Sequence, residues 1–365
     1  MRGPPAGVDA TAAGRNEVPA TRSVMTHIAS SPPARSRQRL HALVARGELP
    51  AHVCGIIEQF FDSYNEALRE AGLDPADHDH LLHGFVDRVA ERRATPFVFE
   101  PYHRQVTEPF DYYTFGIEFL RPLVDKTRST VSGLDILARI DAQLRARENV
   151  VLLSNHQTEG DPQAISLLLE ASYPAIGKEM IFVAGARVTT DPLPVPFSMG
   201  RNLLCIYSKR YIDHPPEDRA RKIHHNRRTM ERMGELLAEG GHCIYVAPSG
   251  GRDRRNADGV VEVAPFDPQS VEMFQVMAER APRPTHFYPM ALGTYDFLPP
   301  PETVQYEIGE ARKAKRTGLH LAVRPEIDMH AIPGTDVGHK HERRAARAAF
   351  IWRQVADAHA AFPRE

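Results

Sequence analysis

Cysteine is scarce in this sequence, and long apolar runs are absent. The three cysteines among 365 residues, Cys54, Cys205 and Cys243, stand far apart, without the paired spacing of a metal site or a disulfide framework. We therefore expect buried free thiols and a reducing compartment. No apolar run approaches the roughly 20 residues that a membrane-spanning helix needs, so any membrane contact should be peripheral.

The chain also has almost no net charge. Its 45 Lys and Arg residues nearly balance 47 Asp and Glu residues, which gives a formal charge of −2 at pH 7. A nucleic-acid-binding domain usually carries a general basic excess, so we expect no nucleic-acid partner, and any anion site has to be local. With 42% hydrophobic and 25% charged residues, the composition is typical of a folded globular protein.

Three regions differ in their residue patterns. Residues 1–35 are rich in Pro, Gly, Ala, Ser and Thr and have almost no large apolar side chains, which predicts a disordered leader. Residues 36–95 carry apolar residues at spacings of three and four, interrupted at 47–50 and 72–75, which predicts a small antiparallel helical bundle. Residues 96–365 follow a different pattern and form the third region.

In the third region, short apolar runs alternate with amphipathic stretches. Strands are expected at 150–153, 181–184, 203–207, 243–247, 287–292 and 321–323, and helices at 134–147, 162–171, 217–238, 268–280 and 341–361. Strands separated by helices are typical of α/β proteins. The sequence therefore predicts a larger α/β domain, with a mixed sheet flanked by helices, beside the small helical bundle.

A histidine cluster in the helical region has the residue types of a metal site, namely His78, Asp79, His80 and His83. No matched set of carboxylates or thiolates lies nearby in the sequence. We therefore expect a solvated helix entry, and neither a metal nor a cofactor.

The strongest chemical signal follows the expected strand at 150–153. His156 stands five residues before Asp161, with Gly160 between them to let the chain turn. A carboxylate that holds one ring nitrogen lets the other nitrogen take a proton from a hydroxyl, as acylation of an alcohol requires. The alternative is structural, because Asp161 followed by Pro162 is also a typical helix start with an aspartate N-cap.

Two further segments are candidates for binding an anion. After the expected strand at 243–247, two glycines precede Arg252, Arg254 and Arg255, whose planar guanidinium groups suit phosphate oxygens. The alternative is a solvated basic turn in which Asp253 is the internal partner of the arginines.

The second basic segment runs from Arg201 through a strand to Lys209, Arg210 and Tyr211, and could converge on the same anion. The expected helix at 217–238 is rich in arginine, which favours a solvated face. Docking of an acidic acyl carrier protein or an anionic lipid is the alternative for that helix.

Together these blocks resemble the soluble, plastid-type glycerol-3-phosphate 1-O-acyltransferases of the His-x4-Asp acyltransferase superfamily. The similarity spans roughly residues 40–320 and includes the segments at 99–103, 108–113, 154–162, 182–185, 191–193, 196–202, 207–209, 247–254, 265–267 and 288–289. The resemblance implies a small helical domain on a larger α/β domain, as the residue patterns do.

The resemblance also implies roles for single residues. It makes His156 the base and Asp161 its partner. The implied phosphate ligands are Lys209, Arg210, Tyr211, Arg252 and Arg254. One pair departs from the plant enzymes, which have Lys-His where this chain has Arg210 and Tyr211, and a tyrosine hydroxyl can donate only one neutral hydrogen bond.

The expected activity is transfer of a long-chain acyl group from acyl carrier protein or acyl-coenzyme A to the sn-1 hydroxyl of glycerol 3-phosphate. The product would be lysophosphatidate, at the first step of phospholipid synthesis, in the cytoplasm or alternatively in the plastid stroma. Two other classes stay open: an acyltransferase for another acceptor, such as a lysophospholipid, and a noncatalytic phosphate- or lipid-binding protein.

Overall fold

The computed structural model describes residues 34–209, 212–300, 312–336 and 338–363. The expected disordered leader falls almost wholly outside these residues, as do Arg210 and Tyr211.

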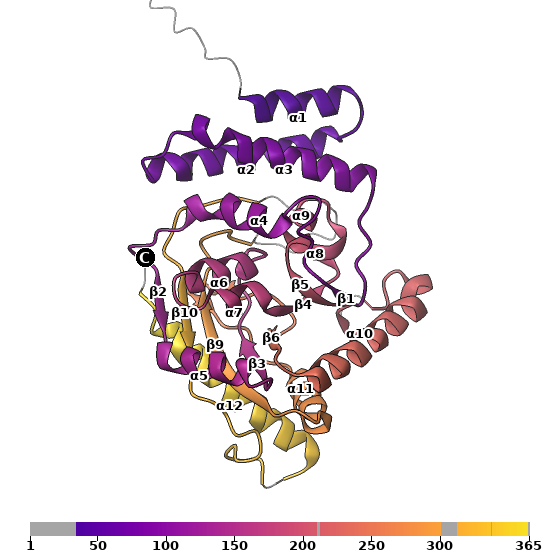
Figure 1. Cartoon of the computed structure of the whole chain (residues 1–365), viewed down its shortest axis with the longest axis vertical. Coiled ribbons are helices and arrows are strands. Elements are labelled where there is room, and N and C mark those ends of the chain that lie inside the picture. The colour runs from indigo at the N-terminus through magenta and orange to yellow at the C-terminus, as the bar shows by residue number, and fades with distance from the viewer. Residues whose placement is uncertain (1–33, 210–211, 301–311, 337, 364–365) are drawn as a thin grey trace, which may run out of the picture. The chain divides into compact units, whose positions relative to one another are not determined.

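Three helices form the N-terminal part, as the spacing of apolar residues predicts (Figure 1): α1 (Arg35–Ala45), α2 (Ala51–Glu70) and α3 (Pro75–Ala94). The carboxylate of Asp74 caps α3 by accepting from the backbone N–H of Ala76, and Pro75 occupies the first turn. Aspartate followed by proline is a favoured helix start, because it satisfies an exposed N–H and fixes φ.

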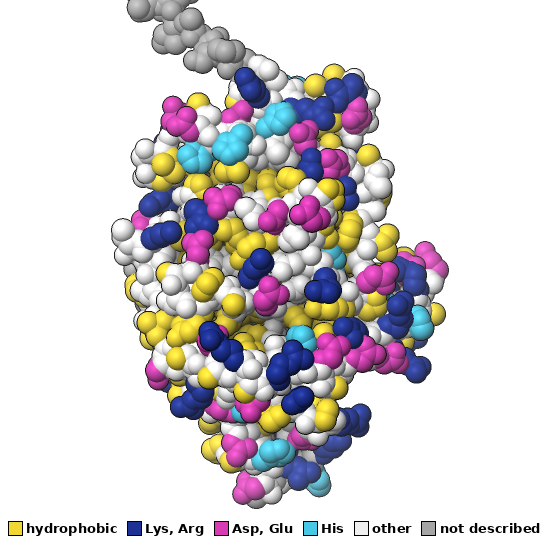
Figure 2. All heavy atoms as spheres, in the orientation of Figure 1, with side chains coloured by type: hydrophobic (Ala, Val, Ile, Leu, Met, Phe, Trp, Pro, Cys, Tyr) yellow, Lys and Arg dark blue, Asp and Glu magenta, His cyan; other side chains and the backbone are white. Residues whose placement is uncertain are grey.

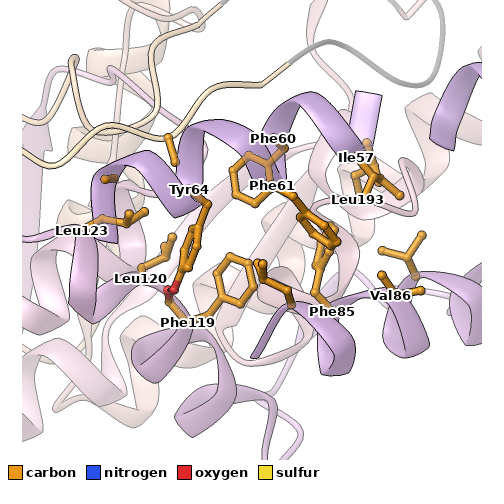
Figure 3. Packing of buried hydrophobic residues seen from close by; sticks show 14 of the residues in the cluster. Ile57, Phe60, Phe61, Tyr64, Phe85, Val86, Phe119, Leu120, Leu123 and Leu193 are labelled. Atoms are coloured by element: carbon orange, nitrogen blue, oxygen red, sulfur yellow. The ribbon is translucent and has the colours of Figure 1, made fainter. Parts of the chain in front are cut away.

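The three helices share an aromatic core with α4 (Tyr112–Leu120) and the 3-10 turn η1 (Arg121–Leu123). Figure 3 shows Phe60, Tyr64 and Phe85 turned toward Phe119 of α4. The Tyr64 hydroxyl donates to the Phe119 carbonyl at 2.6 Å, so the polar end of this buried ring has a partner. A domain boundary at residue 95 stays a prediction, since this core continues into α4.

The centre of the molecule is an eight-stranded mixed sheet. Its strands in spatial order are β1 (Tyr102–His103), β5 (Asn202–Ile206), β4 (Ile181–Gly185), β6 (Cys243–Val246), β3 (Asn149–Ser154), β9 (Thr285–Gly293), β10 (His320–Val323) and β2 (Thr130–Ser132). The run from β5 to β9 is parallel. Strand β1 pairs antiparallel with β5, β10 pairs antiparallel with β9, and β2 pairs parallel with β10. This sheet confirms the predicted α/β fold class.

Helices cover both faces of the sheet. Val150 and Leu152 of β3 pack into one core with α5 (Leu134–Arg145), α6 (Asp161–Leu169) and α7 (Pro174–Glu179). Val151 and Leu153 pack into the other core, with α10 (Arg219–Glu239), α11 (Pro268–Arg280) and α12 (Lys340–Ala360). Since β3 is buried on both faces, it has a continuous apolar sequence instead of an alternating one.

The remaining described elements are short: α8 (Arg187–Thr190), α9 (Val195–Met199), η3 (Pro216–Asp218) and a hairpin of β7 (Arg254–Arg255) and β8 (Val261–Glu262). All six expected strands and all five expected helices of the third region are confirmed to within a few residues. Four short strands, α4 and the shorter helices α7, α8 and α9 were not predicted. The strands have only two or three residues, too few for a periodicity, and α4 is rich in aromatic residues that also favour strands.

Candidate active site

The candidate chemical groups lie on loops at one edge of the sheet. Strands β3, β4, β5, β6 and β9 run parallel, so their carboxyl ends meet at this edge. The loop after β3 carries His156, the loop after β5 carries Lys209, and the loop after β6 carries Arg252. Open α/β sheets bind their ligands at such an edge.

His156 and Asp161 are in direct contact. The imidazole Nδ1 lies 2.7 Å from Asp161 Oδ2, with the ring 33% exposed and the carboxylate side chain 1% exposed. The buried carboxylate accepts a hydrogen bond from Nδ1–H, so Nε2 is the nitrogen that can take a proton from a ligand. Partial exposure of the ring gives a ligand access to it.

Asp161 does not cap its own helix. It is the first residue of α6, Gly160 holds the N-cap position, and there is no side-chain cap bond. The carboxylate instead accepts the backbone N–H of Gln157 at 2.9 Å and of Thr158 at 3.2 Å, and the Thr294 hydroxyl at 2.6 Å. The N-cap alternative from the sequence is therefore wrong, and the turn of the loop is built around this side chain.

Gly160 is not required by the turn, contrary to the expectation from the sequence. Its φ is −84°, which any residue can adopt. A Cβ at this position would lie 2.9 Å from Leu298 Cδ1 and 3.2 Å from Phe297 Cε1. A side chain here would therefore require these two side chains of the segment after β9 to shift.

Asp253 connects the arginine loop, which follows β6 and carries Arg252, to the histidine loop, which follows β3 and carries His156. Its backbone N–H donates to the His156 carbonyl at 2.7 Å, and its buried carboxylate accepts from Asn155 Nδ2 at 2.8 Å and Gln157 Nε2 at 3.1 Å. Burial raises the pKa of Asp253 to about 6. The sequence alternative, in which Asp253 pairs with the arginines of a solvated turn, is not what these contacts show.

Asn155 and Gln157 are site residues that the sequence reasoning missed. The Asn155 side chain pairs with the backbone of Leu292 on β9, at 2.8 and 2.9 Å. Gln157 Oε1 accepts the Thr294 backbone N–H, and its Nε2 lies 2.9 Å from Nε2 of His359 on α12. Burial lowers the pKa of His359 to about 4, which keeps its ring neutral and able to accept from the amide.

A buried ion-pair cluster was also missed. The Arg312 guanidinium bonds Glu159 at 2.8 and 3.2 Å and Asp191 at 3.2 Å. Burial alone raises the pKa of Glu159, but Arg312, with smaller contributions from Arg252 and Arg187, outweighs it and lowers the pKa. Arg252 therefore lies close enough to the histidine loop for its charge to act there.

The candidate phosphate ligands differ in their contacts. Lys209 reaches from the loop after β5 to the start of α11, where its Nζ lies 2.7 Å from Gln269 Oε1 and 3.4 Å from Asp267 Oδ2. Arg252 and Arg254 are partly exposed on either side of buried Asp253. The expectations for Arg210 and Tyr211 fall on residues that the structure does not describe.

Arg201 does not join these residues. It precedes β5, at the opposite end from Lys209, and is only 2% exposed. Its guanidinium bonds the Ser166 hydroxyl at 2.9 Å and the Gly177 carbonyl at 3.2 Å, and it also bonds the Pro162 carbonyl. The expectation that it converges on the anion site is wrong, because it holds α6 and α7 together.

Helix α10 presents a mixed surface. Along it, Arg221 pairs with Asp218, Arg227 with Glu231, and Arg232 with Glu235 and Glu239. Figure 2 shows acidic and basic side chains interspersed where α10 lies in Figure 1. These short-range exposed pairs favour a solvated face over docking of an acidic partner.

Other candidate features lie away from this edge. Within the described ranges, one group of potential metal ligands is close together, namely His41, Cys54 and Glu58 on α1 and α2, where His41 already bonds Glu58 at 2.6 Å. Among all the helices of the described residues, none combines the length and the apolar composition of a membrane span.

Comparisons with known proteins agree with this geometry. The family model described as Acyltransferase matches residues 129–293, which include the histidine and arginine loops. Fold and site thus define an acyltransferase.

The relatives identify the family more closely. The chain is 40% identical to the chloroplastic glycerol-3-phosphate acyltransferase of Arabidopsis thaliana, over 92% of this chain and 74% of that protein. It is also 40% identical to the chloroplastic enzyme of that name from Spinacia oleracea, over 85% of this chain and 67% of that one. The chain belongs to the glycerol-3-phosphate acyltransferase family.

Among solved structures, the crystal structure of the 1-acyl-sn-glycerophosphate (LPA) acyltransferase PlsC from Thermotoga maritima aligns with 90% of this chain and 97% of its own, at 11% identity and a TM-score of 0.39.

Proposed function

We propose that this protein transfers a long-chain acyl group from an acyl thioester to the sn-1 hydroxyl of glycerol 3-phosphate and releases lysophosphatidate and a thiol. The observation that carries the proposal is the contact of His156 with buried Asp161, on a loop bonded through Asp253 to the loop of two arginines. The family membership supports the choice of glycerol 3-phosphate as the acceptor.

In the proposed reaction the acceptor attacks the thioester directly. His156 Nε2 takes the proton of the sn-1 hydroxyl as its oxygen bonds the carbonyl carbon, and Asp161 stabilises the imidazolium that forms. The tetrahedral intermediate then expels the thiolate, which takes up a proton. A positioned base of this kind contributes about 10²–10⁴-fold to the rate.

The oxyanion of that intermediate needs hydrogen-bond donors. Two backbone N–H groups in the turn of the histidine loop, those of Gln157 and Thr158, already donate to Asp161. The oxyanion donors therefore have to be other groups.

A covalent acyl-cysteine is the rival mechanism. Burial raises the pKa of both Cys205 and Cys243 to about 12, and both thiols lie within strands of the sheet core. A thiol with so high a pKa supplies almost no thiolate at neutral pH. These environments support direct transfer.

The phosphate of the acceptor is assigned to Arg252, Arg254 and Lys209, with Arg210 and Tyr211 as further candidates from the sequence. A guanidinium can bind two phosphate oxygens at once, which fixes the direction of the glycerol chain as well as its position. The donor is acyl carrier protein or acyl-coenzyme A, which present the same kind of thioester. The names of the chloroplastic relatives favour the plastid stroma, the alternative location, over the cytoplasm.

The test is release of free thiol from acyl-coenzyme A and from acyl carrier protein, each with and without glycerol 3-phosphate. We expect release that depends on glycerol 3-phosphate and is abolished in His156→Ala. Release that instead depends on a lysophospholipid would replace the acceptor, and binding of glycerol 3-phosphate without any thiol release would indicate a noncatalytic protein. More than about a tenth of wild-type kcat in folded His156→Ala would contradict the assignment of the base.

A further inference from the structure

Asp253 lies between the two arginines assigned to the phosphate, yet its own side chain is bonded elsewhere. The residue is fully buried, whereas Arg252 and Arg254 are partly exposed. A carboxylate between two arginines lowers the attraction of that loop for an anion. Its presence there calls for a compensating role.

The contacts of Asp253 supply such a role. It makes three hydrogen bonds to three consecutive residues of the histidine loop: to Asn155 and Gln157 through its carboxylate, and to the His156 carbonyl through its backbone N–H. The other carboxylate oxygen accepts the backbone N–H of Ala264 at 3.0 Å. One residue thus joins the loop after β6, the loop after β3 and the segment after the β7–β8 hairpin.

The course of the chain does not by itself hold the two loops together. They follow different strands, and Gly250 in the arginine loop has φ of +64°, in a stretch where Gly250 and Gly251 are both exposed. Glycines of this kind make a segment easy to deform. The arginines therefore depend on a contact beyond the glycines to fix their distance from His156.

We propose that Asp253 is a positioning residue for the acceptor, which holds Arg252 and Arg254 at a set distance from His156 so that the phosphate and the hydroxyl of one molecule are bound together. This inference rests on the proposed function, because it assumes an acceptor with a phosphate at one end and a reactive hydroxyl at the other. It assigns no proton transfer to Asp253.

The geometry distinguishes two substitutions. In Asp253→Ala, both side-chain bonds to the histidine loop are lost. In Asp253→Asn, the amide oxygen can keep the Oδ2 position and still accept from Asn155 and Gln157, while the amide nitrogen opposes only Ala264. Asparagine should therefore preserve the position of the arginines at some loss of stability, whereas alanine should not.

The experiment measures kcat and KM for glycerol 3-phosphate with acyl-coenzyme A as donor in the full-length protein. We expect KM to rise about tenfold or more in Asp253→Ala and to stay within about threefold of wild type in Asp253→Asn. Asp258→Ala is the matched control, since Asp258 is exposed at the tip of the same hairpin. It should leave both constants unchanged.

A double variant tests whether the effect passes through the arginines. The double variant Arg252→Ala/Asp253→Ala should raise KM by clearly less than the product of the two single effects, because one of the arginines that Asp253 positions is already missing. If Asp253→Ala does not fold, Asp253→Ser replaces it, as the serine hydroxyl is too short to bond Asn155 and Gln157.

The outcomes separate this inference from the proposed function. Wild-type protein without thiol release dependent on glycerol 3-phosphate would overturn both. An active wild type in which folded Asp253→Ala keeps its KM, or in which asparagine and alanine raise KM alike, would overturn the positioning role alone. A fall in kcat that follows only the folded fraction would reduce Asp253 to a structural residue.

Discussion

Replacing Asp161 with Asn tests how the carboxylate supports the base. Each carboxylate oxygen has two donors: His156 Nδ1 and the Gln157 N–H meet Oδ2, and the Thr158 N–H and the Thr294 hydroxyl meet Oδ1. An amide has only one oxygen, so its nitrogen must face one of these pairs. A peptide N–H cannot become an acceptor, whereas the Thr294 hydroxyl can, and His156 Nδ1 can do so only if the imidazole changes its tautomer.

We expect the amide nitrogen to face Thr294 and the amide oxygen to stay against His156, since a hydroxyl changes role by rotating, without a change of tautomer. The imidazole then keeps its proton on Nδ1 and loses only the negative charge beside it. At an effective dielectric constant of about 20, a carboxylate about 4 Å from an imidazolium charge stabilises it by about 4 kcal/mol. At about 1.36 kcal/mol per tenfold, kcat should fall about a thousandfold while KM for glycerol 3-phosphate changes little.

A second substitution checks the orientation of the amide. Thr294→Val should cost less than about tenfold in kcat by itself, because the Asp161 carboxylate keeps its other three donors. In Asp161→Asn, the same change removes the hydroxyl that is expected to accept from the amide nitrogen, so the additional loss should be larger than in the wild-type background. Both are measured by thiol release with saturating substrates, after circular dichroism has confirmed folding. Asp161→Asn with more than a tenth of wild-type kcat, or an equal effect of Thr294→Val in both backgrounds, would refute this reasoning.

Two further predictions concern the arginine loop. Arg252→Ala and Arg254→Ala should each raise KM for glycerol 3-phosphate roughly 10- to 150-fold, which corresponds to about 1.5–3 kcal/mol of lost binding free energy. Arg227→Ala, on the ion-paired surface of α10, is the control and should leave KM unchanged. An unaffected KM in the two variants would remove Arg252 and Arg254 from the site. Burial raises the pKa of Asp253 from 3.8 to about 6, so the native state binds its proton more tightly than the unfolded state, and this contribution to stability is full below pH 4 and is lost as pH rises through 6. In urea unfolding, the wild type should thus lose about 2 kcal/mol relative to Asp253→Asn between pH 4 and 7, and a difference that stays constant with pH would contradict the burial of the charge.

The fold could be predicted largely because its central strands are buried on both faces. Strands such as β3, β6 and β9 are short continuous apolar runs, and helices such as α11 begin with a capping aspartate and a proline. These signals are local. Helix α4 was missed because its sequence of aromatic and branched residues also suits a strand, and only its cap at Asp111 and its packing under α2 and α3 make it helical.

In the site, too, contacts between residues close in sequence could be predicted and contacts between distant residues could not. The contact of His156 with Asp161 lies within one turn, so their spacing could suggest it, whereas the ion pair of Arg312 with Glu159 spans 153 residues and leaves no local pattern. Even the local pair was ambiguous. An aspartate before a proline is compatible both with a helix start and with a partner for a base. The structure shows that the Asp161 side chain points back toward the loop and bonds His156 instead of capping α6.

The loops at the sheet edge are held by side chains that bond across them, and this explains which residues were overlooked. Asn155, Gln157, Asp253 and Thr294 are on three different loops, and no spacing in the sequence connects them. Their amide, carboxylate and hydroxyl groups satisfy one another at full burial, where an unpaired polar group would be costly. Removal of one member should therefore leave its partners unsatisfied and let the loops shift, so the position of His156 depends on residues other than its partner Asp161.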